Sequence, residues 1–331
     1  MRKRDHMNKP NLFSYATSEL SQDAFICWLL SWASPEYKNS DNDLHECAAG
    51  LITLLFDKHK LKLPEIEQVE IRKQDKNIDV LCIINSKYPI IIEDKTVTKH
   101  HSNQLARYIE EIKGRDFDDD KIIPVYYKTE DQGNYSSVKK NGYHLLLREE
   151  IVDVLNKYRG TNSIFLDYRD HLQSITDKVE RYKSISISDW GWYSWVGFFR
   201  ELQKQLKGGN WDYVANPSGG FLGFWWQFQE NEECAQYLQL EKDKFCFKIR
   251  VKNEAQQKSL RKKWHKIFKE KAQDFELRLV KPKRFRNGKH MTVCVYDGDY
   301  RKTIDGILDM SATIAQFRKA ENLLKSVHEI A

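Results

Sequence analysis

Two apolar runs, residues 77–84 and 88–95, flank the short polar segment Asn85-Ser86-Lys87. A three-residue connection between two such runs is a common hairpin loop, so the pattern predicts a β-hairpin centred on Ser86. Apolar residues occupy both faces of the two strands, which is typical of strands inside a sheet. The hairpin therefore belongs to the core of the predicted fold.

Asp79 and Glu93 lie at equal distances along the sequence on the two sides of Ser86, so this register places them opposite each other. Cross-strand partners have Cβ atoms about 4.5–5.5 Å apart. Lys95 lies on the same face as Glu93 because side chains alternate along a strand. One face of the hairpin is thus predicted to carry all three side chains, although a one-residue bulge would undo the register.

Two adjacent carboxylates in apolar surroundings repel each other and lose solvation, so they need a cation or one of them must hold a proton. Carboxylate oxygens suit hard divalent cations such as Mg2+ or Mn2+. Lys95 would then orient or activate an attacking water, or stabilise charge on a phosphate. This chemistry is metal-assisted phosphodiester hydrolysis. The alternative is that Glu93-Asp94-Lys95 forms the solvated exit of an ordinary hairpin.

A helix is predicted at residues 21–33, and Glu19 lies in the acidic segment that leads into it. Glu19 is the first candidate for a further carboxylate ligand, and Asp23 and Glu46 are the alternatives. A Glu at this position also complements a helix dipole without any catalytic role. The other elements predicted in this half are a helix at 44–58, strands at 66–74, 121–128 and 143–147, and helices at 148–158 and 162–182.

A further helix is predicted directly after the hairpin, at residues 102–113, with Ser102 as its N-cap. Gln104 and Tyr108 are spaced i,i+4 in this helix, so both project from one face. The predicted chain order is therefore helix, strands, helix and strand.

This order, together with the residues named above, resembles the PD-(D/E)XK nuclease superfamily, whose core is αβββαβ. The resemblance covers about residues 10–150. The matching residues are a first-helix acid, the motif Asp, (D/E) and Lys, and the Gln-hydrophobic-x-x-Tyr pair of the RecB-like branch, here Glu19, Asp79, Glu93, Lys95, Gln104 and Tyr108. Ile78 stands where the motif has Pro, a position at which the superfamily tolerates other residues. The opening segment, residues 11–30, also resembles a bacterial PD-(D/E)XK family whose members are poorly characterised and often associated with mobile elements or defence.

The resemblance implies an α/β fold with a restriction-endonuclease-like αβββαβ core, in which helices flank a mixed sheet. It implies a Mg2+-dependent (or Mn2+-dependent) nuclease that hydrolyses DNA, with RNA left open as a substrate. The implied catalytic residues are Asp79, Glu93, Lys95, Gln104 and Tyr108, and the implied metal ligands are Asp79, Glu93 and Glu19. Gln104 and Tyr108 would support the site or contact the phosphate backbone. Two alternatives stay open, a nucleic-acid-binding protein with a degenerate nuclease fold and a defence module that cuts only after a partner activates it.

The chain of 331 residues is long enough for two domains. We expect a nuclease domain at 1–185 and an α+β accessory domain at 186–331, joined near the polar segment 183–188. The elements predicted in the second half are a helix from a cap at Asp189 to Leu206, strands at 211–215, 221–229 and 244–252, a basic helix at 253–272, strands at 275–281 and 290–296, and a last helix at 303–328.

Lys and Arg outnumber Asp and Glu by 54 − 48 = 6, a modest excess that favours polyanionic partners. The second half contains clustered cations at 248–252, 261–263 and 281–286, with Trp264 and Phe285 between them. Cations interleaved with aromatic residues suit phosphate contacts and base stacking. The alternative is a solvated face over core aromatics, in a domain that serves homo-oligomerisation or binds a defence-system partner.

The six cysteines form no C-x-x-C pair and the ten histidines no zinc-binding spacing, so we expect reduced thiols and neither zinc nor an iron–sulfur cluster. For His100-His101, a solvated helix entry is the alternative to metal ligation. No run approaches the ~18 apolar residues of a membrane span, and no apolar segment follows the basic start. We therefore expect a cytoplasmic protein without membrane contact.

Overall fold

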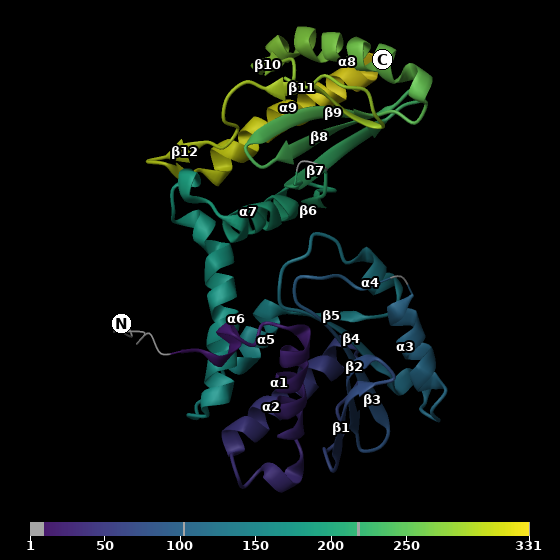
Figure 1. Cartoon of the computed structure of the whole chain (residues 1–331), viewed down its shortest axis with the longest axis vertical. Helices are drawn as coiled ribbons and strands as arrows, with labels where there is room; N and C mark the ends of the chain where they lie inside the picture. The colour runs from purple at the N-terminus through teal and green to yellow at the C-terminus, as the bar shows by residue number, and fades with distance from the viewer. Residues whose placement is uncertain (1–9, 102, 217–218, 331) are drawn as a thin grey trace. The chain divides into compact units, whose positions relative to one another are not determined.

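The structure, a computed structural model, describes residues 10–101, 103–216 and 219–330, and the chain divides into two compact units (Figure 1). The division falls after Asp177, inside helix α6 (Ser163–Glu180), and residues 132–134 belong to the second unit. Each unit has its own sheet and its own hydrophobic core.

The first unit is built on a five-stranded mixed sheet with the strand order β1-β2-β3-β4-β5. The first three strands pair antiparallel, whereas β4 runs parallel to β3 and β5 parallel to β4. The strands are β1 (Val69–Asp75), β2 (Ile78–Ile84), β3 (Tyr88–Lys95), β4 (Ile123–Lys128) and β5 (His144–Leu147). Besides α6, the helices are α1 (Glu19–Ser31), α2 (Asn42–Lys58), α3 (Gln104–Lys113), α4 (Ser136–Lys140) and α5 (Arg148–Leu155).

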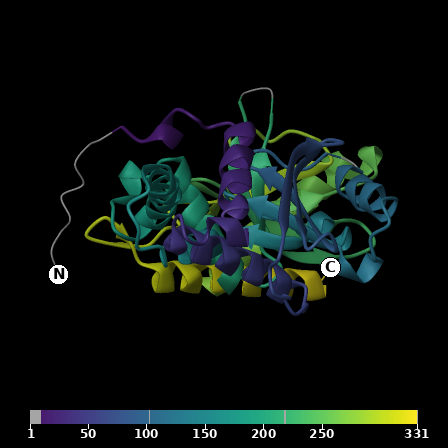
Figure 2. The same cartoon turned by 90° about the horizontal axis from the view of Figure 1, so that it is seen from below.

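Helices cover both faces of this sheet. Figures 1 and 2 show α1 and α2 on one side of the strands and α3 on the other. α1 packs against β1, β2 and β3, and α3 packs against β3. On the α3 side, Leu81 and Ile91 of the hairpin join Leu105, Tyr108 and Ile112 of α3 in one buried cluster. The hairpin is apolar on both faces because both faces are buried.

The predicted hairpin register is confirmed. β2 pairs with β3 so that Val80 lies opposite Ile92, in a series centred on Ser86. One residue further along, the same register sets Asp79 opposite Glu93. This segment contains no bulge between Val80 and the turn, so the alternation seen in the sequence is preserved in the sheet.

The second unit contains a six-stranded antiparallel sheet with the order β10-β11-β9-β8-β7-β6. Its strands are β6 (Asn210–Val214), β7 (Phe221–Glu230), β8 (Ala235–Glu241), β9 (Lys244–Arg250), β10 (Leu279–Val280) and β11 (His290–Tyr296). Its helices are α7 (Trp192–Gln205), α8 (Gln257–Lys271) and α9 (Met310–Ile330), and a small hairpin, β12 (Thr303–Ile304) with β13 (Ile307–Leu308), precedes α9. Trp226 and Trp264 are fully buried in the core of this unit, so neither ring is available to stack on a base.

The predicted fold class is confirmed. The first unit has the αβββαβ order with α2 inserted between α1 and β1, and the second unit is an antiparallel sheet with helices. Strand β8 was not predicted, because the buried Gln236 and Gln239 interrupt its apolar pattern. Helix α4 was not predicted either, since five residues are too few to show a helical period.

Three boundaries in the second half are wrong in the prediction. Asp189 does not cap α7, since it ends a 3-10 turn and Gly191 stands at the N-cap. The strand predicted at 275–281 is reduced to β10, because a 3-10 turn and the left-handed Glu276 (φ 56°) occupy its first residues. The last helix begins at Met310, because the hairpin of β12 and β13 takes the preceding residues.

Within the described ranges, no helix combines the length and the apolar character that crossing a membrane requires. The six cysteines are free thiols, and all except Cys27 are buried.

Candidate active site

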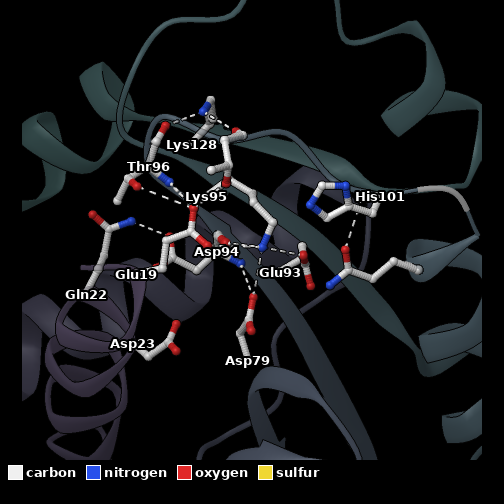
Figure 3. Close-up of polar contacts among 12 residues, drawn as sticks. Glu19, Gln22, Asp23, Asp79, Glu93, Asp94, Lys95, Thr96, His101 and Lys128 are labelled. Atoms are coloured by element: carbon white, nitrogen blue, oxygen red, sulfur yellow. Dashed lines mark hydrogen bonds and ion pairs between the residues drawn. The ribbon is translucent and has the colours of Figure 1, made fainter.

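The candidate site lies where β2 begins and β3 ends. Asp79 projects from β2, and Glu93 and Lys95 project from β3 (Figure 3). The backbone N–H of Asp94 donates to Oδ2 of Asp79 at 3.0 Å, so the carboxylate of Asp79 is tied to the neighbouring strand. The predicted convergence of the three side chains on one face is what the structure shows.

The ammonium of Lys95 lies among three carboxylates. Its Nζ is 2.6 Å from Oε1 of Glu93, 3.5 Å from Oδ2 of Asp79 and 3.6 Å from Oε2 of Glu19. It also donates to the backbone oxygen of Asp94 at 2.7 Å. Burial lowers the pKa of Lys95, but the charges of Glu93, Asp79 and Glu19 raise it by more, so the net pKa lies above its ordinary value. Lys95 is therefore a protonated hydrogen-bond donor in this arrangement.

Glu19 reaches the site from the first residue of α1. Ser18 caps the helix by accepting from the N–H of Ser21, so the helix begins at Glu19, two residues earlier than the predicted start at Ser21. The carboxylate of Glu19 accepts from the N–H of Thr96 at 3.1 Å and from the hydroxyl of Thr98 at 2.6 Å. Burial raises the pKa of Glu19, but these hydrogen bonds and Lys95 together lower it below its usual value. Glu19 thus remains ionised beside Lys95.

The segment that holds Glu19 is itself anchored by a buried lysine, Lys128 of β4. Its ammonium donates to the backbone oxygens of Thr96 and Thr98. Burial lowers the pKa of Lys128 to about 8, with Glu130 acting in the opposite direction. Lys128 therefore fixes the strand exit that positions Glu19, and the sequence pattern alone did not single it out.

The ionised form of Glu93 is electrostatically disfavoured. Its side chain has no exposed surface, and its Oε2 accepts no hydrogen bond from any described residue. Burial, and next the charge of Asp79, raise the pKa of Glu93 to about 8, although Lys95 acts in the opposite direction. A buried carboxylate in this position must take up a proton or be balanced by more positive charge than one lysine provides.

This donor set fits a hard divalent cation. Among residues 10–101, 103–216 and 219–330, no three His, Cys, Asp or Glu side chains are already grouped as a metal site, since the Lys95 ammonium separates the carboxylates here. The free Oε2 of Glu93, together with Asp79 and Glu19, supplies oxygen ligands of the kind that Mg2+ and Mn2+ prefer. The three carboxylates are thus suited to hold such an ion, with Lys95 beside it.

A second pair of carboxyl groups lies behind the hairpin, on the face that α1 covers. Asp94 is fully buried and accepts from the amide of Gln22, while its Oδ2 receives no donor from the described part of the chain. Burial, and next the charge of Asp23, raise the pKa of Asp94 well above its usual value. Burial, and next Asp79, raise that of Asp23 to about 6. Alternation along β3 assigns Asp94 to this face, which is the one signal in the sequence that could have found the pair.

Gln74 links the two faces. Its Nε2 lies 3.0 Å from Oδ2 of Asp23 and 3.2 Å from Oδ1 of Asp79. Gln74 has a left-handed backbone (φ 55°) at the end of β1, just before a turn in which Lys76 and Asn77 are also left-handed. A non-glycine residue in this conformation is disfavoured, so the contact with Asp79 is made at a conformational cost.

Gln104 and Tyr108 lie on one face of α3, as predicted, but they bond to each other. Nε2 of Gln104 donates to the Tyr108 hydroxyl at 2.9 Å, and Oε1 of Gln104 accepts from the N–H of His101. In the described chain, neither makes a hydrogen bond to Asp79, Glu93 or Lys95. Ser102, the predicted cap, lies outside the described residues.

The two fallback acids have different surroundings. Asp23 is buried and enters the network through Gln74. Glu46 is exposed on α2, where it accepts from Asn42 one turn away. Of the paired histidines, His100 contacts the Ser137 hydroxyl at 3.0 Å, and burial lowers its pKa. Glu46 and His100 therefore have local structural partners of their own.

A protein-family model for the PD-(D/E)XK nuclease superfamily matches residues 10–186. The chain belongs to the PD-(D/E)XK nuclease superfamily. Comparisons with curated proteins and with solved structures found no match. Members of the PD-(D/E)XK superfamily typically use divalent metals, and membership implies a nucleic-acid substrate. The matched residues include the whole hairpin and both flanking helices, α1 and α3.

Proposed function

We propose that this PD-(D/E)XK protein is a divalent-metal-dependent nuclease that hydrolyses phosphodiester bonds of DNA. The observation that carries the proposal is the approach of Asp79, Glu93 and Glu19 to one point, which the Lys95 ammonium contacts. One carboxylate would be enough to neutralise the Lys95 ammonium in a simple buried ion pair. Three carboxylates around one lysine leave excess negative charge, and a divalent cation balances such an excess.

In the proposed site, Asp79 and Glu93 hold Mg2+ or Mn2+, and Glu19 assists from α1. When bound, the cation supplies positive charge to the scissile phosphate and lowers the pKa of the attacking water. The chain's own residues position the other groups. Lys95 is protonated, so it donates to the attacking water or to a phosphate oxygen and stabilises the charge that develops there.

The reaction is an in-line displacement at phosphorus. The water oxygen forms a bond to phosphorus and loses a proton to solvent, while the bond from phosphorus to the leaving sugar oxygen breaks. The bonding electron pair stays on that oxygen, which takes a proton. Gln104 and Tyr108 are joined to each other on α3, and we assign them to supporting the site or contacting the phosphate backbone.

Cleavage assays test the proposal directly. The purified chain is incubated with supercoiled, linear and single-stranded DNA and with RNA, in Mg2+, in Mn2+ and in EDTA. We expect cleavage that needs the metal and that Asp79→Asn abolishes. Cleavage that survives both EDTA and Asp79→Asn would contradict the assignment of these residues.

A partner-activated module is the second candidate function. The observation in its favour is that the Lys95 ammonium lies between Glu93 and Glu19, where it competes with a metal for the same carboxylates. A partner that moves this ammonium would then allow the metal to bind in the position that cleavage requires. Metal binding without cleavage by the pure chain would support this candidate. Because residues 11–30 resemble a bacterial family often associated with mobile elements or defence, we propose phage defence or mobile-element biology as the setting of either activity.

A further inference from the structure

The loop that joins β10 to β11 carries positive charge only. Residues 281–289 contain Lys281, Lys283, Arg284, Arg286 and Lys289 and no acidic residue, and all five cations are exposed. Among the described residues, none of the five forms an ion pair with a carboxylate. The cations therefore repel one another without local compensation.

Helix α8 adds three lysines beside this loop. Lys258, Lys262 and Lys269 are exposed and stand at positions i, i+4 and i+11, so they share one helix face with His265 at i+7. The His265 ring contacts the ring of Phe285 in the loop, with 5.3 Å between centroids. The lysine face of α8 and the loop are thus neighbours, and we call these three lysines and the five loop cations the basic surface.

Arg261 fixes the loop against α8. Its Nη1 donates to the backbone oxygen of Phe285 at 2.7 Å, and its guanidinium lies 4.2 Å from the centre of the Phe285 ring. The side chain of Arg261 is buried, its Nε has no hydrogen-bond partner among the described residues, and no carboxylate pairs with it. A buried cation without an acid raises the positive potential of the surface above it.

Two other lysines of α8 are neutralised, unlike those of the basic surface. On α8 itself, Lys263 pairs with Glu233 at 2.7 Å and Lys271 pairs with Asp274 at 3.3 Å. Eight exposed cations for which the described residues provide no acidic partner lie together on the loop and on the adjoining helix face. This distribution is the one expected where a polyanion supplies the missing negative charge.

We propose that the basic surface binds the phosphate backbone of double-stranded nucleic acid without reading its sequence. The proposal rests on the proposed nuclease function for the class of polymer and adds a binding surface in the second unit. Phe285 is the only aromatic residue of the loop, and Arg261, Lys281 and His265 already contact its ring. It cannot serve as a free platform for bases, so phosphate contacts remain, and a duplex presents phosphates outward.

Binding without cleavage tests the proposal. Fluorescence anisotropy of a labelled DNA duplex of mixed sequence is measured in EDTA with wild type and with a variant carrying Lys283→Ala, Arg284→Ala and Arg286→Ala. At about 100 mM salt we expect the variant's Kd to rise by roughly tenfold or more, and the slope of log K against log salt to flatten by up to about 3, since each lost phosphate contact removes about 0.9. Arg261 is left intact because it anchors the loop.

A matched control carries Lys183→Ala, Lys204→Ala and Lys207→Ala, three exposed cations on other elements of the same unit. It removes the same charge and should leave both Kd and the salt slope nearly unchanged. Equal losses in the two variants would overturn the proposal, because a general charge effect would then explain binding. Wild-type binding to anionic lipid vesicles but not to duplex DNA would overturn it as well.

Failure of the binding-surface proposal can be distinguished from failure of the nuclease proposal. If the loop variant cleaves in a metal-dependent manner and keeps the wild-type affinity and salt slope, the binding role of the basic surface is rejected and the proposed nuclease activity stands. Duplex binding that is lost in the loop variant, in a chain that never cleaves, would leave the basic surface standing and remove the nuclease activity. Circular dichroism melting should be the same for both variants, since every substituted side chain is exposed.

Discussion

The Lys95 ammonium lies 2.6 Å from Oε1 of Glu93, two residues away on the same face of β3. Both side chains are almost completely buried, and Asp79 from the neighbouring strand adds a second negative charge. The pair therefore combines a lysine that keeps its proton with a carboxylate that tends to acquire one. From this pairing of a protonated lysine with a carboxylate of raised pKa, we derive how activity and stability should respond to mutation, pH and metal.

Removing the lysine should separate chemistry from metal binding. We expect Lys95→Ala to lower the rate constant of cleavage by roughly 10²–10⁴-fold, the range for a positioned proton donor. Affinity for Mn2+ should stay the same or rise, because a competing cation has been taken from the carboxylates. Cleavage kinetics and isothermal titration with Mn2+ measure the two effects. Lys87→Ala, an exposed lysine in the hairpin turn, is the control, and an unchanged rate in Lys95→Ala would exclude the role assigned to this lysine.

Glu93→Gln should abolish activity and stabilise the metal-free protein. The ionised carboxylate of Glu93 is disfavoured by burial and by Asp79, as its pKa of about 8 indicates. At pH about 9, where the carboxylate is ionised, we expect the free energy of unfolding to rise by up to about 5 kcal/mol, since the pKa of about 8 lies nearly 4 units above the unfolded value of about 4.3 and one unit corresponds to about 1.4 kcal/mol. Chemical denaturation measures this, with the exposed Glu110→Gln as control. A marked loss of stability in Glu93→Gln would show that its ion pair with Lys95 outweighs the repulsion.

The raised pKa of Glu93 also predicts a pH dependence. Between an unfolded-state pKa of about 4.3 and a folded-state pKa of about 8, the folded metal-free chain holds a proton that the unfolded chain has lost. The stability contributed by this proton is complete below about pH 4.3 and disappears as pH rises through about 8. Mg2+ must displace the proton, so its affinity should increase over the same window. Thermal melting with and without Mg2+ at several pH values tests this, and a Mg2+-induced shift that does not grow with pH would contradict it.

Gln74 should act as a positioning residue for Asp79. Gln74→Gly relieves the left-handed backbone but removes the amide that contacts Asp79 and Asp23, so stability should hold while activity falls by roughly 10–100-fold, as for other partners of metal ligands. Lys76→Gly relieves the same kind of backbone in the next turn and should leave cleavage unchanged. Cleavage rates and Mn2+ affinity distinguish the two variants. Equal activity in both would reduce Gln74 to a structural residue.

The local pattern of apolar and polar residues was sufficient to predict the hairpin and the grouping of Asp79, Glu93 and Lys95 on one of its faces. A strand alternates with period two and a short turn fixes the register, so residues close in sequence determine which side chains share a face. Because the prediction uses only residues close in sequence, it also failed to find strand β8 and helix α4. β8 has buried glutamines that look polar in sequence, and α4 is too short to show a period. The polar character of these segments carries no information on what they pack against.

Tertiary structure alone decided what surrounds the carboxylates. The sequence by itself determined that Glu19 precedes an apolar helix, but the docking of α1 on the sheet brings its carboxylate to Thr96 and Lys95. The same docking places Gln22 against Asp94, across 72 residues of chain. Contacts of this kind depend on how a helix face meets a strand exit far away along the chain, and no periodicity within either segment encodes the distance between them. The sequence thus determined which side chains share a face of the hairpin, and the packing of α1 decided their charge balance.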